Sequence, residues 1–370
     1  MKPTAYWRDA SVAIGLTGAK LLVYAVLAGF VLGYFELGQA MCQWDCGWYL
    51  SIVQQGYDIA PHLVDGWWQA NWAFFPLYPL LVSGLNALTG DDPKIAGIMV
   101  STVCFIGFAV LGARYRRLSR QEASFWPWLP LVFAWPFSFY FHAVYSEALY
   151  AVLATAALLK LAERKPMAAG IATAFLTATR PTGILLVAWI GLDRLWHARS
   201  AGTPFRALRS LIPAAVALLG LLAFMLFLYV RTGDAWAFRH IQSGWQRTGR
   251  NPLAVLADAF TGFELFHPPL GPLYLFGWAI LGLAAAVWLG IRRRFAEAWL
   301  CGMTVMMGLI SGSLFSMPRY VATNPAFLLA VADLLARVRR PKLRAAILIG
   351  MAAAQVALLL FWFRGAAFLI

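Results

Sequence analysis

The chain has 370 residues, of which 61% are hydrophobic and only 12% are charged. Soluble globular domains carry about 25% charged residues, so this composition excludes an ordinary soluble protein and predicts a polytopic, all-α membrane protein. In a soluble protein the net charge of +14 would suggest a nucleic-acid partner. In a membrane protein it is typical of basic cytoplasmic loops, so we expect no nucleic-acid partner.

Apolar segments recur along the chain and predict about eleven transmembrane helices. Several are shorter than the ~20 residues that a bilayer requires, which indicates loose boundaries or broken helices. In chain order, the predicted spans are 13–35, 95–113, 124–141, 148–162, 167–179, 184–196, 210–230, 271–291, 296–315, 320–336 and 345–363.

The loops between these spans predict the orientation, because Lys and Arg are enriched on the cytoplasmic side. With the N-terminus inside and the C-terminus outside, the cytoplasmic segments hold 21 of the 30 Lys and Arg residues. Lys20 lies within the first span, where we expect its side chain to extend toward the interface. The cytoplasmic clusters are Lys2/Arg8, 114–120, 160–165, 194–209, 292–294 and 337–344.

Segment 74–90 is apolar enough to resemble another span, but counting it would move the cluster at 114–120 outside. We therefore expect a helix in the outer leaflet, within a long first outer loop at 36–94. A second long outer segment covers 231–270. We expect one domain, residues 1–370. Because long loops are often functional, we expect these two segments to form its active-site face.

The first candidate for chemistry is Asp45, which precedes a short amphipathic helix expected at 46–56. A carboxylate at the membrane surface is a suitable general base. Alternatively, Asp45 caps that helix and the nearby Trp residues anchor the interface, and the residues favour neither interpretation. The side chains available to face lipid are Trp44, Trp48, Tyr49 and Ile52.

The second acid is Glu147, expected at the outer end of a span beside His142 and Tyr145. An ionisable group at membrane depth costs about 2.5 kcal/mol or more on insertion scales, and usually has a partner or a task. The alternative is a favourable acid in the first turn of a helix. A functional role for Glu147 is favoured. The predicted topology places both Asp45 and Glu147 at the outer face.

Two arginines lie at predicted helix breaks, Arg180 before Pro181 and Arg319 after Pro318. Broken helices are tolerated at membrane depth only where protein or a cavity covers the backbone. Guanidinium groups suit phosphate, because they form bidentate, charge-assisted hydrogen bonds. The alternative for each arginine is a structural ion pair with Asp45 or Glu147.

The second outer segment mixes basic, polar and aromatic side chains, including Arg239, His240, Gln242, Arg247 and Arg250. Such a surface suits an anionic lipid headgroup or a sugar, or else an interfacial helix without chemistry. The spacing of Cys42 and Cys46 leaves their pairing open. No nucleotide-binding glycine loop, zinc-binding His pair or serine-hydrolase motif occurs, so ATP-driven transport and zinc hydrolysis lack support.

Taken together, these segments resemble the PIG-V-type family, that is, GPI mannosyltransferase II and its bacterial relatives, within the GT-C superfamily. Cys46 departs from the family pattern, which has Gly or Ala after Trp-Asp. The acceptor of the GPI enzymes cannot be assigned to this chain, because bacterial relatives occur where no GPI is made. In family order, the matching stretches are WDCGWYLSIVQQGYD, NWAFFPLYPLL, SFYFHAVYSEALY, TATRPTG, GDAWAFRHIQSGW and SMPRY.

The resemblance implies a GT-C fold with juxtamembrane helices in the first outer loop, a polyprenyl-phosphate sugar donor and inversion at the anomeric carbon. It implies that Asp45 is the base, that Arg319 or Arg180 binds the donor phosphate, and that Glu147 assists. The resemblance leaves open whether Asp45 and Glu147 bind a divalent cation, and no other cofactor is expected. The remaining residues expected to bind substrate are Tyr320, His240, Gln242, Trp44 and Tyr145.

We therefore expect a multi-pass glycosyltransferase of the bacterial inner membrane that transfers mannose to an acceptor on the outer face. The acceptor is a glycan, lipid or protein. The alternatives are a flippase for lipid-linked sugars, which forms no bond, and a GT-C transferase for another sugar. No internal repeat of the kind found in carriers is visible, and the acids gather at one face, which favours the enzyme.

Overall fold

The computed structural model describes residues 3–33, 36–64, 66–90, 92–120, 126–198, 208–261 and 271–369. In this part of the chain, helices are joined by turns and irregular segments, and the β structure is one antiparallel hairpin, β1–β2, in which Leu63 lies opposite Trp68. The prediction of an all-α protein is therefore confirmed. The elements are α1 (Pro3–Leu32), α2 (Leu37–Ala40), α3 (Cys46–Gln55), β1 (His62–Val64), β2 (Trp67–Gln69), η1 (Asn71–Ala73), α4 (Leu77–Thr89), α5 (Pro93–Arg120), α6 (Trp128–Ala134), η2 (Ser138–Phe141), α7 (Glu147–Ala162), α8 (Pro166–Thr177), η3 (Pro181–Gly183), α9 (Ile184–Ala198), α11 (Ile212–Thr232), α12 (Ala237–His240), η5 (Ile241–Trp245), α13 (Pro252–Thr261), α14 (Gly271–Ile291), α15 (Phe295–Ser311), α16 (Met317–Ala322), α17 (Pro325–Arg337), α18 (Pro341–Phe363) and η6 (Ala367–Leu369).

Among the described residues, five helices, α1, α5, α11, α14 and α18, are long and apolar enough to cross a membrane. Others, such as the 16-residue α7 and the 12-residue α8, are too short for a hydrocarbon core of about 30 Å at 1.5 Å per residue. They correspond to the predicted short segments at 148–162 and 167–179. The number of spans remains a prediction.

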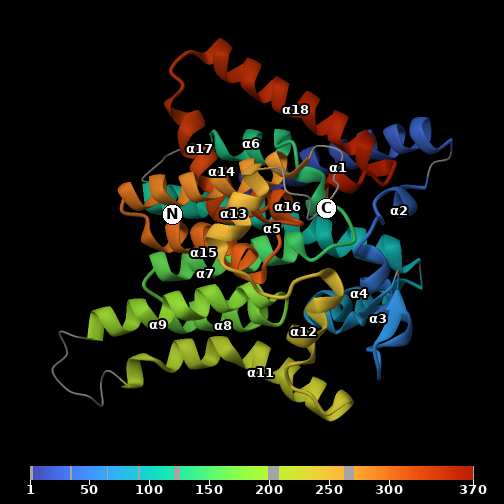
Figure 1. The fold of residues 1–370 in the computed structure, drawn as a ribbon. Helices are drawn as coiled ribbons and strands as arrows, with labels where there is room; N and C mark the ends of the chain where they lie inside the picture. The colour runs from blue at the N-terminus through green and yellow to red at the C-terminus, as the bar shows by residue number, and fades with distance from the viewer. Residues whose placement is uncertain are drawn as a thin grey trace.

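The helices lie side by side in layers (Figure 1). Helix α11 packs against α8, α8 against α7, and α7 against α5, while α14 packs against α15. Helix α18 borders α6 and α1 at the opposite edge. The elements of the predicted first outer loop, α2, α3 and α4, gather at one end of the bundle together with α12 (Figure 1).

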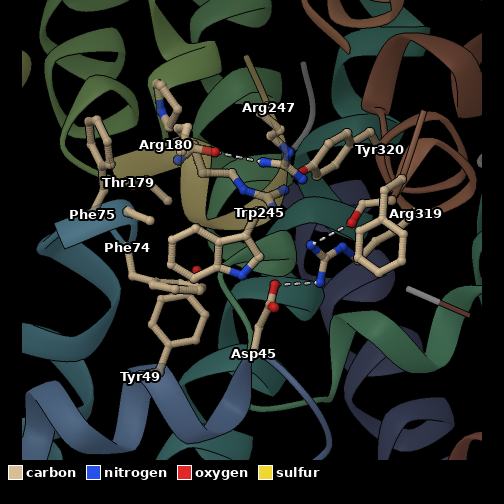
Figure 2. A pocket seen from close by; sticks show the side chains of 15 residues that line it. Asp45, Tyr49, Phe74, Phe75, Thr179, Arg180, Trp245, Arg247, Arg319 and Tyr320 are labelled. Atoms are coloured by element: carbon tan, nitrogen blue, oxygen red, sulfur yellow. Dashed lines mark hydrogen bonds and ion pairs between the residues drawn. The ribbon is translucent and has the colours of Figure 1, made fainter. Parts of the chain in front are cut away.

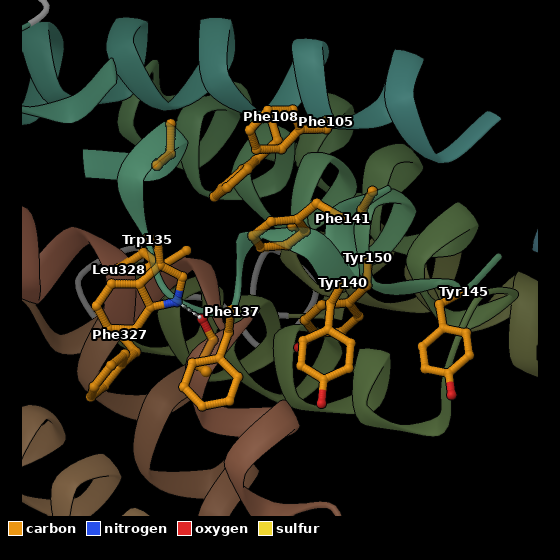
Figure 3. Packing of buried hydrophobic residues seen from close by; sticks show 14 of the residues in the cluster. Phe105, Phe108, Trp135, Phe137, Tyr140, Phe141, Tyr145, Tyr150, Phe327 and Leu328 are labelled. Atoms are coloured by element: carbon orange, nitrogen blue, oxygen red, sulfur yellow. Dashed lines mark hydrogen bonds between the residues drawn. The ribbon is translucent and has the colours of Figure 1, made fainter. Parts of the chain in front are cut away.

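The predicted span at 124–141 is wrong as a continuous helix. Helix α6 ends at Ala134, and η2 begins only at Ser138. Pro136 explains the break, because a residue before proline is pushed out of the helical region, and Trp135 accordingly has ψ 128°. In the buried segment that follows, Phe141 faces Phe105 of α5, with ring centroids 5.6 Å apart (Figure 3).

Side chains from distant helices bind the backbone of this irregular segment, since buried carbonyl groups need donors. The amide of Gln355 donates to the Trp135 carbonyl at 2.5 Å and to that of Phe133 at 3.0 Å. Lys20 donates to Ser138 Oγ at 2.6 Å. The expectation that Lys20 extends toward the interface is therefore wrong, because its ammonium group points into the bundle.

The predicted span at 320–336 is also divided. Helix α16 ends at Ala322, and α17 begins at Pro325. Asn324 caps α17, since its side-chain oxygen accepts a hydrogen bond from the Ala326 amide at 2.9 Å. Arg319 and Tyr320 therefore belong to a separate six-residue helix and not to α17.

Charges of the predicted cytoplasmic loops pair with one another. Arg117 binds Asp9, and Arg114 binds Glu163, although these partners lie far apart in the sequence. Each of these ion pairs joins segments that the positive-inside rule assigned to the same side.

The predicted outer-leaflet helix at 74–90 corresponds to α4, which has 13 residues. Its Tyr78 and Val82 are buried, whereas Leu80 and Leu88 are 63% and 86% exposed. One face of α4 therefore packs on the bundle while the other exposes leucines, and the helix is too short to span a bilayer.

Candidate active site

A cavity of about 90 Å³ lies at the end of the bundle that holds α3 and α4, and five separate stretches of the chain line it. In Figure 2, Asp45 lies at the bottom of the view, and Arg247 and Tyr320 lie at the top. The lining residues are Asp45, Tyr49, Ala73, Phe74, Phe75, Thr179, Arg180, Pro181, Gln242, Trp245, Arg247, Phe315, Ser316, Arg319 and Tyr320.

Asp45 is bound by Arg319, whose Nη1 donates to Asp45 Oδ2 at 2.7 Å (Figure 2). Asp45 directly precedes α3, but its side chain makes no capping hydrogen bond. Capping is therefore not the role of this carboxylate. Its side chain is 22% exposed, and Oδ1 accepts no hydrogen bond from the described residues.

Glu147 is the first residue of α7 and is 1% exposed. Arg180 Nη2 donates to Glu147 Oε1 at 2.7 Å, and Arg319 Nε lies 3.3 Å from the same oxygen. The other carboxylate oxygen, Oε2, has no hydrogen-bond partner within the described ranges. Both arginines therefore form the ion pairs that the sequence left open as an alternative to phosphate binding, and Arg319 bridges the two acids.

The loop that carries Asp45 is held from two directions. The Tyr145 hydroxyl accepts a hydrogen bond from the Asp45 amide at 3.1 Å and donates to the Gln43 carbonyl at 3.0 Å. Cys42 and Cys46 form a disulfide across the same turn. Trp44, expected at the site, does not line the cavity and is 45% exposed.

The break that carries Arg180 depends on close backbone packing. Helix α8 ends at Thr177, and Arg180 is extended at φ −156° and ψ 148° before η3. A Cβ at Gly183 would lie 2.8 Å from the backbone of Leu176, so only glycine allows this turn to fold back onto α8. The predicted break at Pro181 and Gly183 is present and places Arg180 against the cavity.

The second outer segment contributes Gln242, Trp245 and Arg247 to the cavity wall. Arg247 donates to Gln242 Oε1 at 3.0 Å and to the Tyr320 hydroxyl at 3.2 Å. His240, by contrast, does not line the cavity, because its exposed ring points to Asp234 at 2.7 Å.

This segment is docked on the hairpin by a close contact at Gly244. A Cβ there would lie 2.3 Å from the Trp68 carbonyl oxygen, and Gln69 donates from Nε2 to the Gly244 carbonyl at 3.0 Å. Trp245 and Arg247 were not among the residues expected to bind substrate, although the sequence placed Arg247 in a basic surface that suits an anionic headgroup or a sugar. Trp245 closes the matching stretch GDAWAFRHIQSGW, and Arg247 follows it after one residue.

An aromatic wall stands beside the charged groups. The rings of Trp48 and Phe74 stack at 5.8 Å, Trp245 meets Trp48 edge-on at 5.5 Å, and Tyr49 meets Phe74 at 5.2 Å. Tyr49 and Ile52 are buried. The expectation that α3 turns Trp48, Tyr49 and Ile52 toward lipid is therefore wrong, because they pack into the site and the bundle.

Three guanidinium groups surround Tyr320, and the positive charge of the site comes from them. Burial acts to raise the pKa of the Tyr320 hydroxyl, but these neighbours lower it to about 8. In decreasing order of effect they are Arg247, Arg319 and Arg180. The described residues contain no group of three or more His, Cys, Asp or Glu side chains that could hold a metal ion.

An apolar groove of about 620 Å³ runs next to the cavity, between α3 and α4 on one side and α11 on the other. Its lining includes Tyr57, Leu77 and Phe224, with Arg231 as the basic residue. The adjoining pairs Phe75–Pro76 and Ala178–Thr179 each contribute one residue to the cavity and one to the groove. The charged cavity and the apolar groove are therefore immediate neighbours.

Comparison with known proteins identifies one family. The model of the mannosyltransferase (PIG-V) family matches residues 22–252, more than half of the chain. No curated protein matches the sequence.

Solved structures of the oligosaccharyltransferase of Archaeoglobus fulgidus also resemble the chain. The structure with a tethered acceptor peptide has 15% identity and a TM-score of 0.46, and covers 95% of this chain and 55% of its own. The complex with an inhibitory peptide and a dolichol-phosphate has 14% identity and a TM-score of 0.45, with 95% and 56% covered. The chain thus spans little more than half the length of these proteins.

Proposed function

The chain belongs to the PIG-V mannosyltransferase family, and from this premise we propose that it is a GT-C-type glycosyltransferase of the bacterial plasma membrane. Residues 1–370 act as one domain and transfer a sugar, mannose, from a polyprenyl-phosphate donor to an acceptor on the outer face. The anomeric configuration is inverted. The observation that carries the proposal is a half-buried carboxylate, Asp45, facing a cation-lined cavity beside an apolar groove.

Asp45 is the general base of the proposed reaction. Arg319 holds Oδ2 at 2.7 Å, which leaves Oδ1 to accept the proton of the acceptor hydroxyl. The acceptor oxygen attacks the anomeric carbon while the bond from that carbon to the phosphate oxygen breaks. The electron pair leaves with the polyprenyl phosphate, whose growing negative charge is stabilised by the guanidinium groups.

The neighbouring groove supports a lipid-linked donor. A polyprenyl chain is apolar and gains about 25 cal/mol for each Å² that leaves water. The groove offers it an apolar surface that ends beside the charged cavity. A donor bound in this way has its phosphate at the arginines and its chain between α4 and α11.

The disulfide and the charge distribution support an outer location for the site. Disulfides persist in oxidising compartments and are rare in the cytosol, and Cys42–Cys46 lies in the same loop as Asp45. The paired basic loops lie in segments predicted to be cytoplasmic, as the Arg114–Glu163 pair illustrates.

The decisive test is sugar transfer by the purified Asp45→Asn variant in liposomes with polyprenyl-phosphate-mannose and a panel of acceptors. Loss of the base should lower kcat by about 10²- to 10⁴-fold. The control is Asp92→Asn, which removes an exposed acid of the same loop. Near wild-type turnover by a folded Asp45→Asn protein would remove Asp45 from this role.

The same liposomes test the flippase alternative. Movement of the lipid-linked sugar across the bilayer without any product would contradict the transferase. A labelled product that depends on Asp45 would exclude a flippase as the sole activity.

A further inference from the structure

The charges of the site do not balance, and one cation is left over. Glu147 is bound by Arg180, and Asp45 is bound by Arg319, which also contacts Glu147. The three arginines and two acids together carry one net positive charge. A buried arginine that already holds a carboxylate has less to offer an anionic ligand, since its charge is largely compensated.

Arg247 is the remaining cation. It lines the cavity and donates to two neutral oxygens, Gln242 Oε1 and the Tyr320 hydroxyl. No ion pair between Arg247 and a carboxylate occurs in the part of the chain that the structure describes. Its guanidinium is therefore oriented by neutral partners while its charge stays uncompensated.

The Tyr320 hydroxyl completes a two-donor site. Because its oxygen accepts from Arg247 Nη2 at 3.2 Å, its own proton is available to another acceptor. Arg247 has five N–H donors and uses two of them here. The site thus presents a guanidinium and a neutral O–H donor to a ligand in the cavity.

We propose that Arg247 and Tyr320 bind the phosphate of the lipid donor, whereas Arg180 and Arg319 hold Glu147 and Asp45 in position. This inference rests on the proposed function. A sugar phosphodiester carries one negative charge, which the uncompensated charge of Arg247 matches. After the bond to the sugar breaks, the phosphomonoester carries about −1.5 to −2 at pH 7, and the Tyr320 hydroxyl donates to the oxygen that gained the charge.

Direct binding tests this assignment without requiring turnover. The full-length protein in detergent is titrated with a short-chain polyprenyl phosphate that carries no sugar. Since a hydrogen bond to a charged group contributes about 1.5–3 kcal/mol, Arg247→Gln should weaken binding by about 10- to 100-fold, and Arg247→Lys should restore part of it. The thermal stability of Arg247→Gln should remain near that of the wild type, because no carboxylate loses its partner.

The matched control is Arg239→Gln, which removes one positive charge from the same outer segment but from an exposed side chain outside the cavity. It should bind the phosphate as the wild type does. Equal binding by the wild type and Arg247→Gln would overturn the assignment, and so would equal weakening by Arg247→Gln and Arg239→Gln.

If Arg247-dependent phosphate binding is found but no sugar is transferred, the phosphate site stands and the proposed function fails. If sugar is transferred but Arg247→Gln binds normally, the function stands and the site fails.

Discussion

Arginine side chains hold the two acids of the site in position. Asp45 and Glu147 each receive a short hydrogen bond, from Arg319 and Arg180 respectively, and Arg319 reaches both acids. From the sequence, each of these four residues could be identified as a charge with a partner or a task. Which acid pairs with which arginine depends on contacts between residues up to 274 positions apart, and no sequence pattern encodes them.

Glu147→Gln should destabilise the protein strongly. Removing one partner of a buried ion pair costs about 3–5 kcal/mol, because the other charge stays buried without compensation. Adding Arg180→Gln should recover part of this loss. Thermal unfolding of the two single variants and the double variant in detergent measures the coupling, and strictly additive losses would contradict the pairing.

Donor binding should weaken as the pH rises through about 8. The pKa of Tyr320 is lowered to about 8, against an unperturbed value of 10. The sign follows from charge, because above this pH the hydroxyl becomes a phenolate that repels phosphate and cannot donate. The affinity for polyprenyl phosphate, measured from pH 7 to 9, should show this decline in the wild type. Tyr320→Phe should bind more weakly but lack the decline at high pH, and an unchanged pH profile in Tyr320→Phe would exclude the tyrosine as its cause.

At the scale of elements, breaks in helices position the chemistry. Arg180 lies between α8 and α9, Arg319 and Tyr320 lie on the short α16, and Glu147 begins α7 after an irregular buried segment. The breaks at Pro181 and Pro318 were predicted, because proline interrupts helical hydrogen bonding. The irregular segment after α6 was mistaken for a span, because it is as apolar as a helix and distant side chains bind its polar groups, Gln355 the Trp135 carbonyl and Lys20 the Ser138 hydroxyl.

Gly244→Ala should impair donor binding while largely preserving the fold. The added Cβ would lie 2.3 Å from the Trp68 carbonyl oxygen, so η5 must move away from the hairpin and carry Arg247 with it. We expect a higher KM for the donor with little change in Tm. The control is Gly84→Ala in α4, where no atom lies within 4 Å of the new Cβ. Equal kinetics of the two variants would show that this contact does not position Arg247.

At the scale of the whole molecule, the bundle separates two sets of charges. The basic loops and their acids form pairs such as Arg114–Glu163, whereas the site gathers Asp45 and the cavity arginines at the end of the bundle that holds α3 and α4. This separation agrees with the predicted topology, in which the hydrocarbon core lies between the two sets, since a charge inside that core is costly.

Cysteine labelling tests the orientation. In a Cys104→Ser/Cys301→Ser background, which leaves the disulfide intact, a membrane-impermeant maleimide should label Thr89→Cys in intact cells. Lys342→Cys, at the start of α18, should react only after permeabilisation. The reverse pattern would overturn the topology.

The sequence by itself determined the helical membrane class, the family resemblance and the charged residues worth examining, because composition, basic loops and proline breaks are local properties of the chain. Tertiary structure decided which of these residues meet. It bound Arg180 and Arg319 to the acids, left Trp44 and His240 outside the cavity, and brought Arg247 in. The physical reason is that an ion pair or a cavity depends on the packing of distant helices, whereas hydrophobicity and helix breaks act within a few residues.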